Sequence, residues 1–245
     1  MIPMSRVVAA EVFKLCSIRS YRWAVPASAL AVVIAAAVMA AVRPGGGGGV
    51  WDPDPVALPL EYFAYVMMVI GALTVTADLS SGTAAVTESL VPWRSRLVYA
   101  KYLAAGGLAV VAALVVGVLV VAADWLGSGA SATTVFSPAA MGVVLAGLGA
   151  VCLAAVLGVA TGVLVRSTAA AVSLLLLWSF LVETVLIFVI PERVGAYLPF
   201  KTIGGSRVLM EQIGAGTGLA VFALYTALAV GLAALVRSRR DAAVA

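Results

Sequence analysis

Long apolar stretches alternate with short polar segments along the whole chain. A helix needs about 20 consecutive apolar residues to cross a lipid bilayer. Stretches of this length cover residues 23–42, 58–77, 102–123, 139–165, 168–190 and 218–236. Because lipid offers no partners for backbone groups, such stretches satisfy their hydrogen bonds internally as helices. The pattern therefore predicts an all-α polytopic membrane protein, with six transmembrane helices in one domain over residues 1–245.

The boundary between the fourth and fifth stretches depends on two residues, Arg166 and Ser167. Joining the stretches would produce an apolar run of about 50 residues, which is too long for a single crossing. We therefore expect a tight turn at this dipeptide. The fourth stretch also has small residues at every fourth position, which predicts close packing against another helix of the same subunit. These residues are Gly142, Ala146, Ala150, Ala154, Gly158 and Gly162.

The composition supports this class of protein and excludes others. Hydrophobic residues make up 64% of the chain and charged residues 11%, with a mean hydropathy of +1.15. A typical soluble protein has roughly 25% charged residues, so a cytosolic globular enzyme is excluded. The chain has no histidine, and Cys16 and Cys152 are its only cysteines. Histidine-dependent catalysis, a cysteine-rich metal site and a disulfide framework are therefore excluded as well.

The distribution of Lys and Arg predicts the orientation in the membrane. With the N-terminus inside, eleven of the fifteen basic residues fall in inner segments and four in outer segments. Since inner loops of membrane proteins are rich in Lys and Arg, both termini are expected in the cytoplasm. This asymmetry accounts for the net charge of +4 without a nucleic-acid partner. The 22-residue region before the first span favours a retained anchor over a cleaved signal peptide.

Residues 4–21 predict an N-terminal amphipathic helix that lies on the inner membrane surface. Its apolar face is formed by Val8, Val12, Leu15 and Ile18, which recur at helical spacing. Two roles stay open for this helix. It is either a simple anchor before the first span, or a helix that also contacts a cytoplasmic partner.

The inner segment between the second and third stretches predicts a short helix over residues 81–91. Ser81 is a suitable N-cap, and Pro92 stops the helix. One face of this helix combines Thr83, Val86, Thr87 and Leu90. Such a face has little to pack against in its own chain, so it favours docking of a partner subunit. The alternative is an ordinary loop with interfacial anchors such as Trp93.

Residues 191–216 are too polar for a span and too apolar for a simple loop. Gly204 and Gly205 supply a hinge, and Gly214 can end a helix. We expect two short re-entrant helices here, which close the outer face between spans five and six.

Glu183 is the one ionisable residue well inside a predicted span. A carboxylate at mid-bilayer costs about 2.5–3.5 kcal/mol, so it needs a partner, water or protonation. Either Glu183 faces a water-accessible substrate cavity, or it marks a helix break and is satisfied by the backbone or by Arg193.

Several short motifs resemble those of permease subunits of type-2 ABC exporters. They are Glu11-Val-Phe-Lys14-Leu, Ser81-Gly82-Thr83 followed by Pro92 and Arg96, and Tyr197-Leu198-Pro199-Phe200. The six-span layout with both ends inside is similar too, and the resemblance covers essentially the whole chain. It favours the helix-break interpretation of Glu183, because such permeases have short outer helices between spans five and six.

The resemblance implies how the chain engages an ATPase. In such permeases the N-terminal helix and the first cytoplasmic loop dock onto the ATPase subunit, and the loop helix acts as a coupling helix. The implied interface residues are Glu11, Lys14, Ser81, Gly82, Thr83 and Glu88. The chain has no G-x-x-x-x-G-K-[S/T] motif to cradle the phosphates of ATP. We therefore expect ATP and Mg²⁺ on a separate ATPase subunit, with no catalytic residue, metal or cofactor on this chain.

The resemblance also implies a route for cargo along the second and fifth spans, at the interface of two permeases. Candidate lining residues are Tyr62, Tyr65, Met68, Thr74, Trp178 and Glu183. The alternative is that the tyrosines belong to an outer aromatic belt and that Met68 and Trp178 simply pack. An apolar, aromatic route suits a hydrophobic or amphipathic cargo, such as a drug, a peptide or a lipid-like molecule.

The sequence thus predicts the permease of an ATP-driven exporter in a bacterial inner membrane, paired with an identical or related second permease. Its twelve Arg and three Lys residues suit a GC-rich bacterial genome. The alternatives are an ion-coupled carrier and a membrane anchor for a cytoplasmic partner. A carrier usually needs intramembrane acids, and Glu183 is the only candidate for that role.

Overall fold

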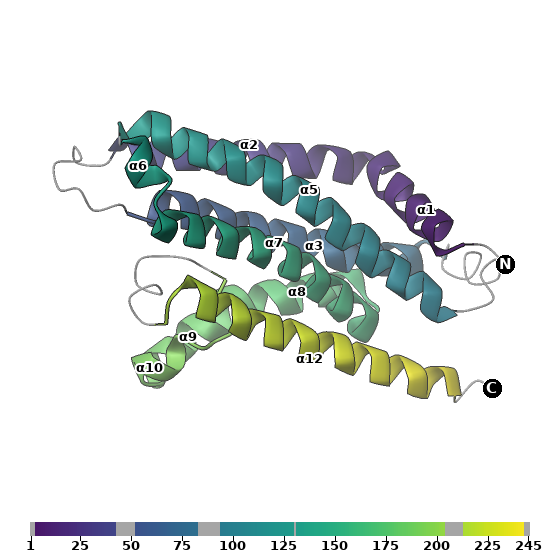
Figure 1. The fold of residues 1–245 in the computed structure, drawn as a ribbon. Helices are drawn as coiled ribbons and strands as arrows, with labels where there is room; N and C mark the ends of the chain where they lie inside the picture. The colour runs from purple at the N-terminus through teal and green to yellow at the C-terminus, as the bar shows by residue number, and fades with distance from the viewer. Residues whose placement is uncertain (1–2, 43–51, 83–93, 130, 204–212, 243–245) are drawn as a thin grey trace.

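The computed structural model describes residues 3–42, 52–82, 94–129, 131–203 and 213–242, and every regular element in these ranges is a helix. The elements are α1 (Met4–Ser17), α2 (Arg19–Val42), α3 (Asp54–Ser80), α5 (Arg94–Ser128), α6 (Ala132–Val135), α7 (Pro138–Val165), α8 (Thr168–Leu177), the π-helix η1 (Trp178–Val182), α9 (Glu183–Val189), α10 (Glu192–Gly195) and α12 (Ala215–Ala242). Figure 1 shows the long helices running side by side in an elongated bundle, with both ends of the chain at the same end.

Six segments of the described chain are long and apolar enough to cross a membrane, which confirms the predicted all-helical, multi-pass class. They are Tyr21–Val42, Asp54–Ser80, Arg96–Ser128, Pro138–Val165, Thr168–Val189 and Ala215–Arg239. The fifth is composite and consists of α8, η1 and α9. We call the end of the bundle that holds both termini the terminal end, and the opposite end the distal end (Figure 1). That the terminal end faces the cytoplasm stays a prediction from the Lys and Arg distribution.

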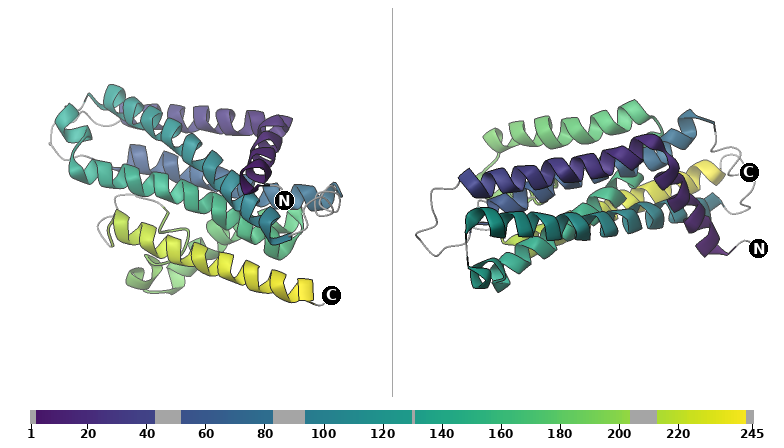
Figure 2. Two further views of the ribbon diagram at one scale, coloured as in Figure 1. Left: turned by 45° about the vertical axis from the view of Figure 1, so that its right-hand side comes forward. Right: turned by 90° about the horizontal axis from the view of Figure 1, so that it is seen from above.

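The centre of the bundle is formed by α3 and α7. In these two spans 67% and 61% of the most apolar stretch is buried, whereas the share is 17% in the spans of α2, α8–α9 and α12. Phe63, Met67 and Met68 of α3 and Val151 of α7 have no exposed surface. Figure 2 shows α2 and α5 side by side, and these two helices also pack against α3. The outward faces of the peripheral helices are apolar, as expected for surfaces that lipid covers.

Backbone contact between α3 and α7 occurs where small residues meet. A Cβ atom added to Gly158 of α7 would overlap the main-chain carbonyl of Met68 in α3. One added to Gly162 would lie 2.8 Å from the carbonyl oxygen of Ala72, and Ala154 of the same row is completely buried. From Ala146 to Gly162 the row of small residues therefore packs within one subunit, as its spacing predicts, whereas Gly142 at its start is exposed.

α1 ends earlier than expected, and its buried face is shifted relative to the predicted apolar face. Ile18 has an extended backbone (φ −69°, ψ 118°), so α1 stops at Ser17 and α2 begins at Arg19. The buried residues of α1 are Val7, Glu11 and Leu15. Val12, which lies on the predicted apolar face, is exposed. Leu15 belongs to both faces, and Val8 and Ile18 are half-buried. Apolar periodicity could not anticipate that a charged residue, Glu11, is buried against partners on other helices.

The turn between α7 and α8 is as tight as expected. Arg166 caps the C-terminus of α7 in the left-handed conformation (φ 60°), and its N–H donates to the Gly162 carbonyl. The next residue, Ser167, begins α8 by accepting a hydrogen bond from the Ala170 N–H. Two residues thus end one span and start the next.

The two short helical regions predicted outside the spans are only partly described. Ser81 caps the end of α3, where its hydroxyl donates to the Ala77 carbonyl at 2.8 Å, and Gly82 follows with φ +72°. Most of the predicted helix at 81–91 lies outside the described residues. Beyond the fifth span, α10 and the turns up to Ile203 are present, whereas residues 204–212 also lie outside.

Candidate functional site

A buried ion cluster at the terminal end joins three helices. Lys101 of α5 donates through Nζ to Glu11 Oε2 of α1 at 2.9 Å. The same ammonium group donates to the Thr74 carbonyl oxygen at 2.9 Å and to Asp78 Oδ2, both on α3. Lys14 of α1 pairs with the other carboxylate oxygen of Asp78. Residues that are 23 to 90 positions apart in the sequence therefore meet around one ammonium group.

Because the cluster is buried, each of its charged side chains needs the opposite charge of its neighbours to be stable. The side chains of Lys101, Asp78 and Glu11 are 5%, 6% and 7% exposed, whereas that of Lys14 is 34% exposed. Its four described members, two carboxylates and two ammonium groups, have a summed formal charge of zero. A buried charge without its counter-charge costs several kcal/mol, on the order of 3–5 kcal/mol when one partner is removed. The cluster therefore holds α1 in a defined position against α3 and α5.

The cluster also flanks the chain segment that connects α3 to α5. Asp78 lies two residues before the end of α3 at Ser80, and Lys101 lies in the second turn of α5. Because Glu11 and Lys14 of α1 contact these two residues, any displacement of α1 acts on both helices at once. The sequence offered one weak sign of this arrangement: Asp78 and Lys101 are charges placed at the inner edges of two apolar stretches.

The residues implied as an ATPase interface are placed unequally. The Glu11 carboxylate is buried in the protein, and the Lys14 side chain, which ends in an ammonium group, is partly exposed. Ser81 and Gly82 are exposed at the terminal end. Thr83 and Glu88 lie outside the described residues. The interface role stays a prediction for all six residues. The structure adds that the Glu11 carboxylate already forms an ion pair with Lys101 of the same chain.

Glu183 begins α9 and is completely buried. The Phe200 N–H donates to both of its carboxylate oxygens, at 3.0 and 3.1 Å, and the Lys201 N–H donates to Oε2 at 3.0 Å. The π-helical turn Trp178–Val182 comes directly before it. Extra residues of this kind in a helix shift the side chains that follow. Backbone amides are the partners expected from the helix-break interpretation. The helix itself does not break at Glu183, because α8, η1 and α9 form one span that continues to Val189.

An aromatic cluster that includes Phe200, the residue whose N–H bonds Glu183, lies in the distal half of the bundle. The ring of Tyr65 lies 5.0 Å from that of Phe180 and 6.2 Å from that of Phe200, and Phe200 lies 6.4 Å from Phe222. The Tyr65 hydroxyl donates to Glu61 Oε1 at 2.9 Å. Rings at these separations attract one another beyond their buried area. The cluster thus ties α3, η1 and α12 to the segment that follows α10.

The six candidate residues for a cargo route do not share one surface. Tyr62 and Trp178 are exposed on the outside of the bundle. Tyr65, Met68, Thr74 and Glu183 are buried. In this conformation Tyr62 and Trp178 are therefore the members that a second subunit or a cargo molecule can reach directly.

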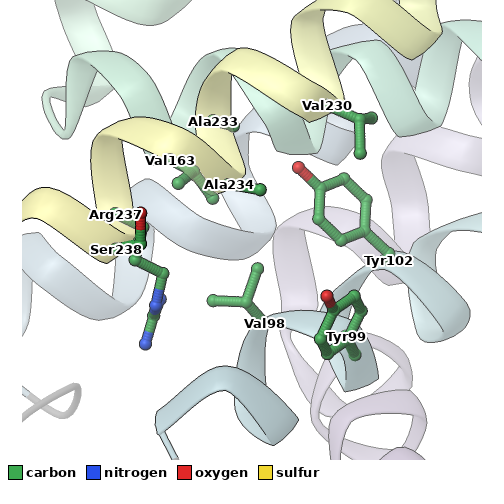
Figure 3. Close-up of a pocket in the computed structure, with 9 residues that line it drawn as sticks. All are labelled: Val98, Tyr99, Tyr102, Val163, Val230, Ala233, Ala234, Arg237 and Ser238. Carbon is green, nitrogen blue, oxygen red and sulfur yellow. The ribbon is translucent and has the colours of Figure 1, made fainter. Parts of the chain in front are cut away.

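A cavity of about 260 Å³ lies near the terminal end, between α5, α7 and α12 (Figure 3). Its lining residues are Val98, Tyr99, Tyr102, Val163, Val230, Ala233, Ala234, Arg237 and Ser238. The sequence did not indicate this cavity, because its walls come from three helices that hydropathy treats separately. One signal was available in the sequence. Tyr99 and Tyr102 lie at the start of one span and Arg237 lies at the end of another, where polar side chains meet the membrane surface.

Within the described ranges, no group of three or more Cys, Asp or Glu side chains is arranged to hold a metal ion. Both cysteines are free thiols. Comparison with known proteins finds no matching family model and no matching curated protein.

Proposed function

We propose that this chain is the permease subunit of an ATP-driven exporter, and that it moves a hydrophobic or amphipathic cargo out of a bacterial cytoplasm. The observation that carries the proposal is the buried ion cluster, which connects α1 to both helices that flank the 83–93 segment. Force applied to α1 by a cytoplasmic subunit reaches the central span α3 through ion pairs. Force applied to the 83–93 segment reaches α3 along the chain itself. A mechanical connection of this kind is what an ATP-driven permease requires.

The proposed complex contains two permeases, identical or related, and two ATPase subunits that bind ATP and Mg²⁺. The absence of a phosphate-binding motif in this chain supports a separate ATPase. Six helices suited to crossing a membrane support the permease role, and the apolar outer faces of α2, α8–α9 and α12 leave ample surface for lipid and for a second permease.

An ion-coupled carrier is the weaker alternative. Its coupling acid needs access to water or to an ion, whereas the Glu183 carboxylate is enclosed and bonded to backbone amides. A membrane anchor that only docks a cytoplasmic protein would use the same surface at the terminal end, and it is distinguished by the absence of transport.

The proposal is tested by co-purification and ATPase activity. The full chain is expressed together with a Walker-motif ATPase encoded beside its gene, and the complex is isolated in lipid nanodiscs. We expect the two chains to co-purify, and ATP to drive loss of a fluorescent amphiphile from loaded vesicles. If no ATPase associates with this chain although the chain inserts normally into the membrane, the proposal of an exporter is wrong.

Point variants then localise the coupling surface. Thr83→Ala and Glu88→Gln should uncouple ATP hydrolysis from amphiphile export at unchanged abundance. Thr133→Ala, an exposed change on α6 at the distal end, serves as the matched control and should leave both activities unchanged. Equal effects of the two sets would contradict docking at the terminal end.

A further inference from the structure

The cavity between α5, α7 and α12 combines apolar walls with a polar group of side chains. Val98, Val163, Val230, Ala233 and Ala234 supply the walls. Tyr99, Tyr102, Arg237 and Ser238 supply the polar atoms. Figure 3 shows Tyr102 reaching from α5 towards α12, with Arg237 extending from α12 on the other side of Val98. A ligand that fits this cavity must itself have an apolar part and a polar part.

The cavity lies at the depth of lipid headgroups. Tyr99 and Tyr102 are in the first two turns of the span Arg96–Ser128, and Arg237 is in the last turn of the span Ala215–Arg239. Tyr and Arg side chains at the ends of spans occupy the membrane–water interface. α5 and α12 both pack on α7, and the cavity fills the gap between them with the exposed ring of Tyr99 at its side. A lipid in the adjacent leaflet can therefore enter sideways.

The Tyr102 hydroxyl is an unsatisfied polar group in this cavity. Its oxygen atom is buried, and it meets no hydrogen-bond partner among the residues that the structure describes. Buried hydroxyls are nearly always bonded, because an unpaired one carries a desolvation cost. Because this oxygen has no accessible surface, a ligand oxygen accepts its hydrogen bond once the Tyr102 ring turns towards the cavity.

The charge of the cavity selects an anion. Arg237 is the one charged residue among the nine that line it, and none is acidic. A guanidinium group has five N–H donors in a planar fork, so it can hold a phosphate as well as another partner. Basic pockets between transmembrane helices bind the headgroups of anionic lipids in this way.

We propose that this cavity is a binding site for one anionic phospholipid of the leaflet at the terminal end. The lipid phosphate lies between Arg237 and the Tyr102 hydroxyl, and the start of an acyl chain lies along Val163, Val230 and Ala233. The bound lipid bridges α5, which carries Lys101 of the ion cluster, to α12. The proposal rests on the cavity alone and holds whether or not the chain belongs to an exporter.

Lipid titration with native mass spectrometry of the full chain tests this site. Phosphatidylglycerol is added to the detergent-solubilised protein, and its first dissociation constant is compared with that of zwitterionic phosphatidylcholine. Arg237→Gln should weaken phosphatidylglycerol binding about tenfold or more, and Tyr102→Phe about fivefold, as expected for a charged and a neutral hydrogen bond. Arg239→Gln removes the same charge from an exposed position outside the cavity and should change binding less than about twofold.

Three results would overturn the proposal. Equal losses in Arg237→Gln and Arg239→Gln would reduce it to general surface charge. Equal affinity for phosphatidylcholine, insensitive to Tyr102→Phe, would show an apolar crevice for neutral chains. Full competition by millimolar inorganic phosphate would show a soluble-anion site. Tyr102→Phe keeps the ring in place, so its unchanged elution profile and thermal transition separate loss of binding from loss of the fold.

Discussion

Removing Lys101 should destabilise the protein far more than removing any exposed basic residue. The substitution Lys101→Met keeps most of the side-chain volume and deletes the ammonium group that bonds Glu11, Asp78 and the Thr74 carbonyl. The summed formal charge of the four described members then changes from zero to −1. Among the described residues Lys101 is the only partner of the Glu11 carboxylate, which becomes a buried charge without a counter-charge.

The size of the effect follows from burial. Leaving one member of a buried ion pair uncompensated costs about 3–5 kcal/mol, whereas an exposed pair contributes about 0–1 kcal/mol. We therefore expect Lys101→Met to lower the free energy of unfolding by about 4 kcal/mol. Lys14→Met, at a side chain that is 34% exposed, should cost about 1 kcal/mol.

Restoring neutrality should restore stability. The double variant Lys101→Met/Glu11→Gln returns the cluster to a formal charge of zero, because the remaining Lys14 and Asp78 still pair. It should recover about half or more of the loss seen in Lys101→Met, because replacing a buried ion pair by neutral groups is often close to neutral. Losses that simply add would mean that the two residues are not coupled.

The assay is reversible unfolding of the full chain in mixed micelles by sodium dodecyl sulfate, followed through the fluorescence of its five tryptophans. Wild type, Lys101→Met, Lys14→Met and the double variant are compared at one temperature and lipid composition. A cost below about 1 kcal/mol for Lys101→Met would refute the buried cluster, since that is the range of a solvent-exposed pair.

Three further predictions use the same preparation. Gly158→Ala places a Cβ atom against the α3 backbone and should lower the free energy of unfolding by about 1–3 kcal/mol or more. Gly142→Ala, with no atom within 4 Å of the new Cβ, should have no such cost, and equal effects would contradict the close helix contact. Glu183→Gln loses a carboxylate oxygen that accepts a backbone N–H, so it should cost about 1–3 kcal/mol and speed hydrogen exchange at Phe200. Unchanged exchange there would remove Glu183 as the anchor of that segment. Arg166→Gly relieves a left-handed backbone (φ 60°) and should leave stability unchanged or raise it by up to about 1 kcal/mol; a clear loss would show that the arginine side chain matters.

Interactions that lie close together in the sequence were predictable. Six spans follow from apolar length, because hydropathy adds up residue by residue and lipid leaves the backbone one favourable conformation. The turn at Arg166 and Ser167 follows from the maximum length of a span. The packing role of the small residues around Gly158 follows from a repeat of four within one helix. None of these inferences requires knowing which helix lies beside which.

Pairing between distant residues was decided only by the tertiary structure. Glu11 appeared as a polar residue outside the apolar face of an amphipathic helix, yet it is buried because Lys101, 90 positions away, supplies its counter-charge. The backbone partners of Glu183, the aromatic cluster around Tyr65 and the cavity beside Tyr102 likewise come from segments that are remote in the chain. The free energy of a buried charge depends on whether a counter-charge lies about 3 Å away in space. Hydropathy along the chain contains no information on such distances. The sequence by itself therefore determined that this protein crosses a membrane with six helices, and the packing of those helices decided which of its few charged residues are buried in pairs.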